Sequence, residues 1–168
     1  MLRPLRTRAP ARTARVGASR FAVVAISLVA LIVAMVSLPR LRELGLRENA
    51  VDAERVLRRI AEVLQSGTPP TLRDAVASDR ILSRALVDGE WLDDGRLRCH
   101  GYLFELRASP APACARAWPW QEGATGGACF ATWSGDPAIY RHANAAGLAS
   151  GLQRTPPERG DAGWVALR

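Results

Sequence analysis

The sequence predicts an α+β fold, in which a long N-terminal helix crosses a membrane and then packs on a small antiparallel sheet of three to four strands. Three observations lead to this prediction. Residues 21–38 carry no charge, and apolar residues then recur at helical spacing up to about residue 66. Between residues 102 and 140, short apolar stretches alternate with turns that contain Gly and Pro. Helices followed by a run of strands are typical of an α+β domain.

The basic residues are unevenly distributed along the chain. All 23 of them are arginines, and the net charge is +7. Residues 1–20 contain no acidic residue and six arginines, namely Arg3, Arg6, Arg8, Arg12, Arg15 and Arg20. A basic arm directly before an apolar segment predicts that this end of the chain stays in the cytoplasm. No helix-turn-helix, zinc-finger or RNA-stacking pattern favours nucleic-acid binding.

The apolar segment Phe21–Leu38 is predicted to be a transmembrane helix. Its only polar residues are Ser27 and Ser37. As a helix it spans about 27 Å, close to the ~30 Å hydrocarbon core of a bilayer. The segment is longer than a typical signal-peptide core, and its far end lacks an Ala-x-Ala cleavage pattern. We therefore expect a retained anchor in the inner (plasma) membrane, with the C-terminal domain on the extracytoplasmic, periplasmic side.

The residues around Gly17 resemble the start of a type IV pilin or pseudopilin. In these families a short basic leader ends in Gly, an apolar helix follows, and a proline lies at a fixed distance beyond the cleavage site. Here Pro39 is the twenty-second residue counted from Ala18. The resemblance implies processing between Gly17 and Ala18, and a pilin-like fold for the part of the chain that it covers.

Two downstream stretches extend this resemblance, which covers about residues 10–141. HGYLFELRASP (100–110) and AWPWQEGATGGACFATWSGDPAIYR (117–141) are similar to a group of bacterial pilin-like proteins. In that group a Gly-Tyr-x-Phe strand precedes a strand with aromatic residues and proline, a Gly-rich turn and a strand that ends in Asp or Gly.

The first mature positions depart from the family pattern. Pilins usually begin with Phe and carry Glu at the fifth position, where it is thought to neutralise a neighbour's N-terminal amine during assembly. Here these positions hold Ala18 and Ala22, and Arg20 stands at the third. Minor pseudopilins of the tip type also lack this Glu.

Two helical segments are expected outside the membrane. The first continues to about residue 66 and ends at Gly67 and Pro69-Pro70. Its apolar stripe is Ala53, Val56, Leu57, Ile60, Ala61, Val63 and Leu64. We expect this stripe to pack on the domain, with a partner helix as the alternative. Thr71 and Asp74 form a variant capping box that opens a second helix through roughly Leu86. Its inward positions are Leu72, Ala75, Val76, Leu82, Ala85 and Leu86.

Four strands are predicted after Gly95. They begin with the alternating stretch 102–107 and continue with 114–120, 128–133 and the short 139–140. The extracytoplasmic domain therefore covers residues 39–141. Residues 142–168 are predicted to be a loosely ordered tail, because apolar periodicity fades there. Residues 164–167 at its end form either a docked strand or a peptide that binds a partner.

Three cysteines would face an oxidising compartment. A disulfide between Cys114 and Cys129 is favoured, because these residues lie in strands on either side of one turn. The alternative is three buried thiols. Cys99 and His100 do not make a nucleophile and its base, since adjacent strand residues point to opposite faces. His142 lies in the predicted tail.

No catalytic, cofactor-binding or metal-binding residues are predicted. The cysteines and histidines lack the close-paired spacing of zinc sites, and Asp93-Asp94-Gly95 is interpreted as a solvated turn. Trp118 and Trp120 share one strand face and form either core packing or an exposed patch.

The sequence thus predicts a non-enzymatic, single-pass membrane protein that is a pilin-like or pseudopilin-like component of a general secretion or pilus-type apparatus. Its partners would be the lipid bilayer and other membrane helices or pilin-like subunits, with no cofactor and no nucleic acid. The alternative is a stand-alone anchored domain that binds a protein or an envelope partner. An envelope enzyme that uses Cys99 or His100 is the least favoured hypothesis.

Overall fold

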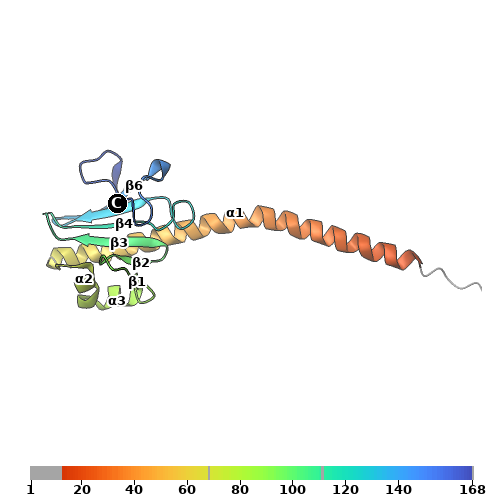
Figure 1. Ribbon diagram of the computed structural model, residues 1–168, viewed down its shortest axis with the longest axis horizontal. Helices are drawn as coiled ribbons and strands as arrows, with labels where there is room; N and C mark the ends of the chain where they lie inside the picture. The colour runs from red at the N-terminus through yellow and green to blue at the C-terminus, as the bar shows by residue number, and fades with distance from the viewer. Residues whose placement is uncertain (1–12, 68, 111, 168) are drawn as a thin grey trace, which may run out of the picture. The chain divides into compact units, whose positions relative to one another are not determined.

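The computed structural model describes residues 13–67, 69–110 and 112–167. The chain divides into two compact units between Leu41 and Arg42 (Figure 1). One helix, α1 (Thr13–Ser66), contributes to both units. The first unit holds the apolar half of α1. The second, here called the head, holds the rest of α1, two short helices and the sheet.

The first unit is an apolar helix that no other part of its own unit covers. Every residue from Arg20 to Val36 is exposed. Among the described residues, α1 is the one helix long and apolar enough to cross a membrane. The prediction of a long apolar N-terminal helix is confirmed. Pro39 lies inside α1 and does not end it.

The head contains an antiparallel sheet of seven strands, which pair in the order of the sequence. The strands are β1 (Glu90–Trp91), β2 (Leu97–Cys99), β3 (Tyr102–Arg107), β4 (Cys114–Pro119), β5 (Cys129–Trp133), β6 (Asp136–His142) and β7 (Trp164–Leu167). The α+β class and the antiparallel sheet are confirmed. The predicted number of three to four strands is wrong, because β1, β2 and β7 are too short to show a periodic pattern. The four predicted strands correspond to β3, β4, β5 and β6.

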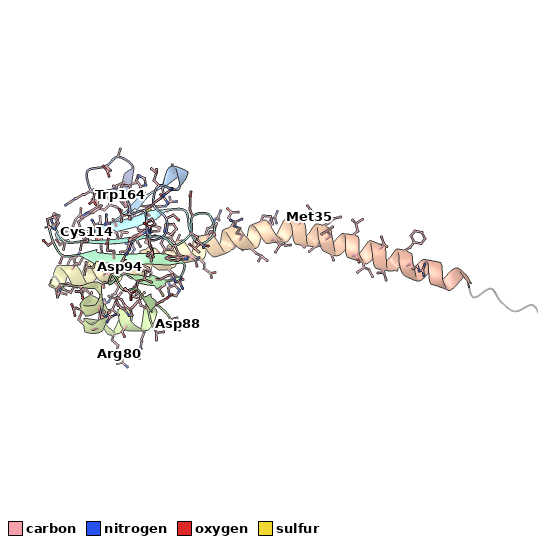
Figure 2. All side chains as sticks on the ribbon, in the orientation of Figure 1. Met35, Arg80, Asp88, Asp94, Cys114 and Trp164 are labelled. Atoms are coloured by element: carbon pink, nitrogen blue, oxygen red, sulfur yellow. The ribbon has the colours of Figure 1, made fainter. Side chains whose placement is uncertain are left out.

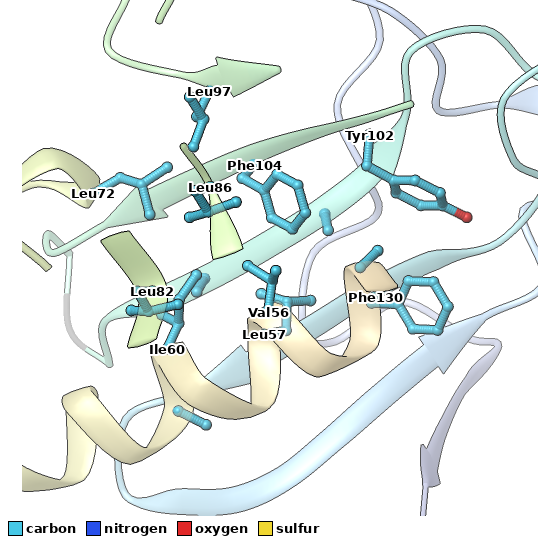
Figure 3. Packing of buried hydrophobic residues seen from close by; sticks show 14 of the residues in the cluster. Val56, Leu57, Ile60, Leu72, Leu82, Leu86, Leu97, Tyr102, Phe104 and Phe130 are labelled. Atoms are coloured by element: carbon cyan, nitrogen blue, oxygen red, sulfur yellow. The ribbon is translucent and has the colours of Figure 1, made fainter. Parts of the chain in front are cut away.

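One face of the sheet packs on α1, and this contact forms the main core. Figure 3 shows Val56, Leu57 and Ile60 of α1 together with Phe104 of β3 in this cluster. These three α1 side chains are at most 4% exposed, and Phe104 is fully buried. Each such side chain contributes about 1.5–3 kcal/mol when it is fully removed from water. The prediction that the helical stripe packs on the domain is therefore confirmed.

The single helix predicted over residues 72–86 is two short helices, α2 (Leu72–Ser78) and α3 (Arg80–Ala85). As predicted, Thr71 caps the first, and its Oγ1 accepts a hydrogen bond from the Asp74 amide at 3.1 Å. Asp79 separates the helices with extended backbone angles, and its carboxylate accepts from the amides of Ile81 and Leu82. Of the predicted inward positions, Ala85 is exposed, because the chain turns at Asp79.

The other face of the sheet is covered by the segment that follows β6. Leu103, Trp118 and Cys129 are completely buried on this face, and they pack with Ala149 of that segment. A 3₁₀ turn, η1 (Ala145–Gly147), lies in the segment, and β7 pairs antiparallel with β6 at its end. The prediction of a loosely ordered tail over residues 142–168 is wrong for residues 142–167, because His142 ends β6 and the residues after it cover an apolar face of the sheet. The two hypotheses for residues 164–167 are decided in favour of the strand.

Candidate functional surface

The most prominent surface of the chain is the exposed apolar half of α1. Its large hydrophobic side chains from Phe21 to Val36 are between 52% and 79% exposed. Figure 2 shows these side chains, Met35 among them, standing out from both sides of the helix. Apolar surface of this extent is unfavourable in water and indicates contact with lipid or with another protein.

Exposed apolar side chains continue on α1 beyond the predicted membrane segment. Leu44 and Val51 are 59% and 54% exposed, and we call this pair the outer stripe. At 3.6 residues per turn, both lie on the side of α1 opposite Leu57 and Ile60, which are fully buried against the sheet. The outer stripe is therefore open to a partner along a helix that is already held in place by the head.

The predicted processing site lies inside α1. Gly17 and Ala18 both belong to the helix that begins at Thr13. Cleavage between them stays a prediction, since the fold does not bear on it. Arg3, Arg6, Arg8 and Arg12 of the basic arm lie outside the described residues.

The structure does not bring Cys114 and Cys129 together. Each of them is the first residue of its strand, and β4 and β5 run antiparallel, so the two lie at opposite ends. Cys114 is paired with Trp133 instead. Four residues of strand separate Cys129 from that position, or about 13 Å, whereas a disulfide requires Cα atoms within ~7 Å. The predicted disulfide is contradicted, and Cys99, Cys114 and Cys129 are all free thiols.

Burial keeps these thiols protonated at neutral pH. It raises the pKa of Cys114 to about 11 and that of Cys129 to about 12. Burial also raises the pKa of Cys99, which is only 5% exposed. Because the thiolate is the reactive form, none of the three is activated as a nucleophile.

The side chains of Cys99 and His100 diverge, as the sequence predicts, but the cause is a turn rather than the strand pleat. Cys99 ends β2 and joins the main core. His100 has a positive φ of 49°, is exposed, and its Nε2 lies 3.1 Å from the carbonyl oxygen of Ala85. In the described part of the chain, no group of three His, Cys, Asp or Glu side chains is arranged to hold a metal ion.

The exposed tryptophan patch considered from the sequence does not form. Trp118 is fully buried, and its Nε1 donates to the carbonyl oxygen of Gly151 at 2.9 Å. Trp120 is half-buried beneath the guanidinium of Arg98, which lies 4.8 Å from the ring centroid. Both therefore serve packing within the head.

A buried arginine, which the sequence analysis did not single out, fixes the C-terminal segment on the sheet. Arg116 is 2% exposed, and its Nη2 donates to Glu105 at 2.7 Å. Its Nη1 donates to Glu158 at 3.2 Å and to the carbonyl oxygen of Pro156 at 3.3 Å. The sequence signal for Arg116 was a single charged residue within the otherwise apolar strand CARAWP. A charge buried in such a strand requires a partner.

No family model, no curated protein and no solved structure matches the chain.

Proposed function

We propose that the chain is a non-enzymatic, single-pass membrane protein that acts as a pilin-like or pseudopilin-like component of a secretion or pilus-type apparatus. The observation that carries this proposal is the division of α1 into two halves. One half is apolar and exposed on all sides, and the other packs on an antiparallel sheet.

This division fits the pilin resemblance of residues 10–141, which implies one long helix shared between a membrane and a head. The basic arm before Phe21 supports an N-terminus in the cytoplasm. The head would then lie in the periplasm.

The mechanism would be packing. In the resting protein, lipid covers the side chains from Phe21 to Val36. In an assembly, helices of neighbouring subunits would replace lipid around this segment, and the outer stripe of Leu44 and Val51 would extend the contact toward the head. Helix association inside a membrane depends on close van der Waals packing, because lipid tails are as apolar as the side chains.

One observation favours the alternative of a stand-alone anchored domain that binds a protein or an envelope partner. Ala22 stands where pilins carry Glu, so this chain has no carboxylate there to pair with a neighbour's N-terminal amine. A buried, unpaired ammonium group in the membrane would be costly.

The first test is N-terminal sequencing of the protein extracted from membranes of cells that contain a prepilin peptidase. We expect Ala18 as the first residue, and Met1 as the first residue in a matched strain without the peptidase. Met1 in both strains would favour the stand-alone domain.

The second test is cross-linking in native membranes. In a Cys114→Ser background, Val51→Cys should give a covalent dimer with a short bismaleimide reagent, since the outer stripe would face a neighbour. Asp93→Cys, in an exposed turn of the head, is the matched control and should stay monomeric. A monomer for both variants would contradict assembly through α1.

A further inference from the structure

The start of the head is tethered close to the membrane segment by the chain itself. Arg42, its first residue, follows Leu38 by four residues. Four residues span about 6 Å as a helix and at most about 14 Å fully extended. The headgroup layer beside the hydrocarbon core is about 5–7 Å thick. Whatever the direction of the chain between the two units, Arg42 therefore lies in or next to that layer when Phe21–Leu38 spans a bilayer.

Hydrogen bonds fix the β4–β5 connection against this start of the head. The Nη2 atom of Arg42 donates to the carbonyl oxygen of Gly123 at 2.6 Å. Two turns further along α1, the side-chain amide of Asn49 donates to the carbonyl oxygen of Thr125 at 2.8 Å. The connection formed by residues 120–128 therefore lies at the membrane-proximal end of the head.

The segment after β6 is fixed at the same end. The amide of Glu122 donates to the hydroxyl of Ser150 at 3.0 Å. The Glu122 carboxylate also lies directly against Gly147, where an added Cβ would meet it at 1.5 Å. Leu148, the next residue, is 62% exposed.

The end of α3 contributes a second exposed apolar residue at this end. Ala85 contacts the His100 ring, and the neighbouring Gly101 lies against Thr125 of the β4–β5 connection. Val87, two residues after Ala85, is 74% exposed. Figure 2 shows Asp88, next to Val87, at the end of the head from which α1 emerges.

Charged residues of both signs also lie at this end of the head. A groove at this end is lined by Glu43, Arg47, Glu122 and Arg141, among other residues. A phospholipid surface with ethanolamine headgroups presents phosphates and ammonium groups side by side, which pair with arginines and carboxylates respectively.

We propose that the membrane-proximal end of the head docks on the phospholipid surface, with Val87 and Leu148 in contact with the lipid headgroups. This proposal rests on the membrane anchor proposed above. Docking would set the orientation of the head, which a single helix alone leaves free to tilt and rotate.

The experiment uses the full chain in vesicles of phosphatidylethanolamine and phosphatidylglycerol. An environment-sensitive fluorophore is attached at Leu148→Cys or Val87→Cys in a Cys114→Ser background. Gly160→Cys is the matched control, because a Cβ there meets no described atom within 4 Å. Its neighbour Arg159 contacts Asp136 at the opposite end of β5 and β6.

We expect emission at shorter wavelength, and several-fold quenching by lipids brominated near the headgroup, for the labels at 148 and 87 but not for the label at 160. Equal, water-like emission at all three sites in chains that float with the vesicles would overturn the docking and leave the anchor intact. If the shift to shorter wavelength at 148 and 87 disappears when the protein is diluted in lipid, a neighbouring copy of the chain covers these residues. That result would also overturn the docking on lipid. Chains that do not float with the vesicles would overturn the anchor as well.

Discussion

At the scale of single residues, Arg116 joins two parts of the head that are distant in sequence. Its guanidinium pairs with Glu105, whose side chain is 19% exposed, and with Glu158, which is 72% exposed. The Nε atom has no partner among the described residues. A buried ion pair of this kind contributes little beyond its desolvation cost while intact, but the loss of one member leaves a buried charge alone.

We therefore expect Arg116→Ala to lower the free energy of unfolding of the head by about 3 kcal/mol, the lower end for a broken buried pair, because the Glu105 carboxylate loses its shorter ion pair and keeps only the Nε of Arg107 at 3.2 Å. Glu158→Ala removes the exposed member and should cost less than about 1 kcal/mol. Urea unfolding of the solubilised chain, followed by tryptophan fluorescence, measures both changes. If both variants lower the free energy of unfolding by a similarly small amount, the stabilising role of the buried Arg116 is contradicted.

Cys114 provides a test of burial through its titration. Burial raises the pKa of its thiol to about 11, against an ordinary value near 8.5. The alkylation rate of Cys114 in the folded chain should therefore keep rising up to about pH 11, as mass spectrometry of the modified peptide can show. In urea the same rate should level off about two pH units lower.

This pKa also has a consequence for stability. Above the ordinary thiol pKa the unfolded chain loses this proton while the folded chain keeps it, so stability should fall from there up to about pH 11. Cys114→Ser should remove this part of the alkaline loss. If Cys114→Ser loses as much stability at alkaline pH as the unchanged chain, the raised pKa of Cys114 is contradicted.

At the scale of elements, Asp79 decides how the region after α1 folds. Its carboxylate caps α3 and also accepts from the Nη2 of Arg59 in α1 at 2.6 Å. The Arg59 guanidinium, together with the amide of Leu82, lowers the pKa of Asp79 below its ordinary value. One side chain thus ends one helix, starts the next and attaches both to α1.

A lowered carboxyl pKa stabilises the fold above the unfolded pKa of about 4, and this stabilisation is lost as pH falls through the folded value. We expect Asp79→Ala to lower stability at neutral pH and to flatten the loss of stability in acid. Asp79→Asn keeps the capping oxygen without the charge, so its loss at neutral pH should be smaller. Thermal unfolding between about pH 6 and pH 2 tests both variants. A steep acid loss retained in Asp79→Ala would show that another carboxylate is responsible.

At the scale of the whole molecule, the head has its own core. The buried residues of the main cluster all lie between Ala53 and Ile139 and none lies in the apolar half of α1. Residues 42–168 should therefore fold without the membrane segment, while the full chain should require detergent or lipid.

Removal of residues 1–41 should give a monomer that is soluble without detergent and unfolds at nearly the same temperature as the head of the full chain. Light scattering after gel filtration and circular dichroism measure the two properties. Aggregation of the shortened chain, together with loss of its unfolding transition, would show that the apolar half of α1 is needed for the fold.

Several elements could be predicted because their signals are local. The uncharged run 21–38, the stripe that contains Leu57, and the Thr71 cap each lie within a few helical turns. The strands β3 to β6 show alternation or bounding turns within single stretches of sequence. Leu57 and Ile60 were expected inside and are fully buried.

Other features depend on which segments meet. The two-residue strand β1 exists because it pairs with β2, and β7 exists because β6 offers it an edge. The disulfide prediction failed because Cys114 and Cys129 are each the first residue of a strand, and the two strands run antiparallel. Their separation therefore depends on strand direction, which their position on either side of one turn does not reveal. Trp118 could not be assigned from the sequence to the core or to an exposed patch, because its cover lies about thirty residues further along the chain.

The sequence by itself determined the apolar helix, its amphipathic continuation and the α+β class, because hydrophobic periodicity acts over neighbouring turns of one segment. Only the tertiary structure decided the seven-stranded order, the free thiols, the cover over Trp118 and the ion pair of Arg116 with Glu158. Each of these features requires two distant segments to lie in contact. These contacts form because they bury apolar side chains on both faces of the sheet at once. A pattern within a single stretch of sequence does not show which distant segment provides the cover.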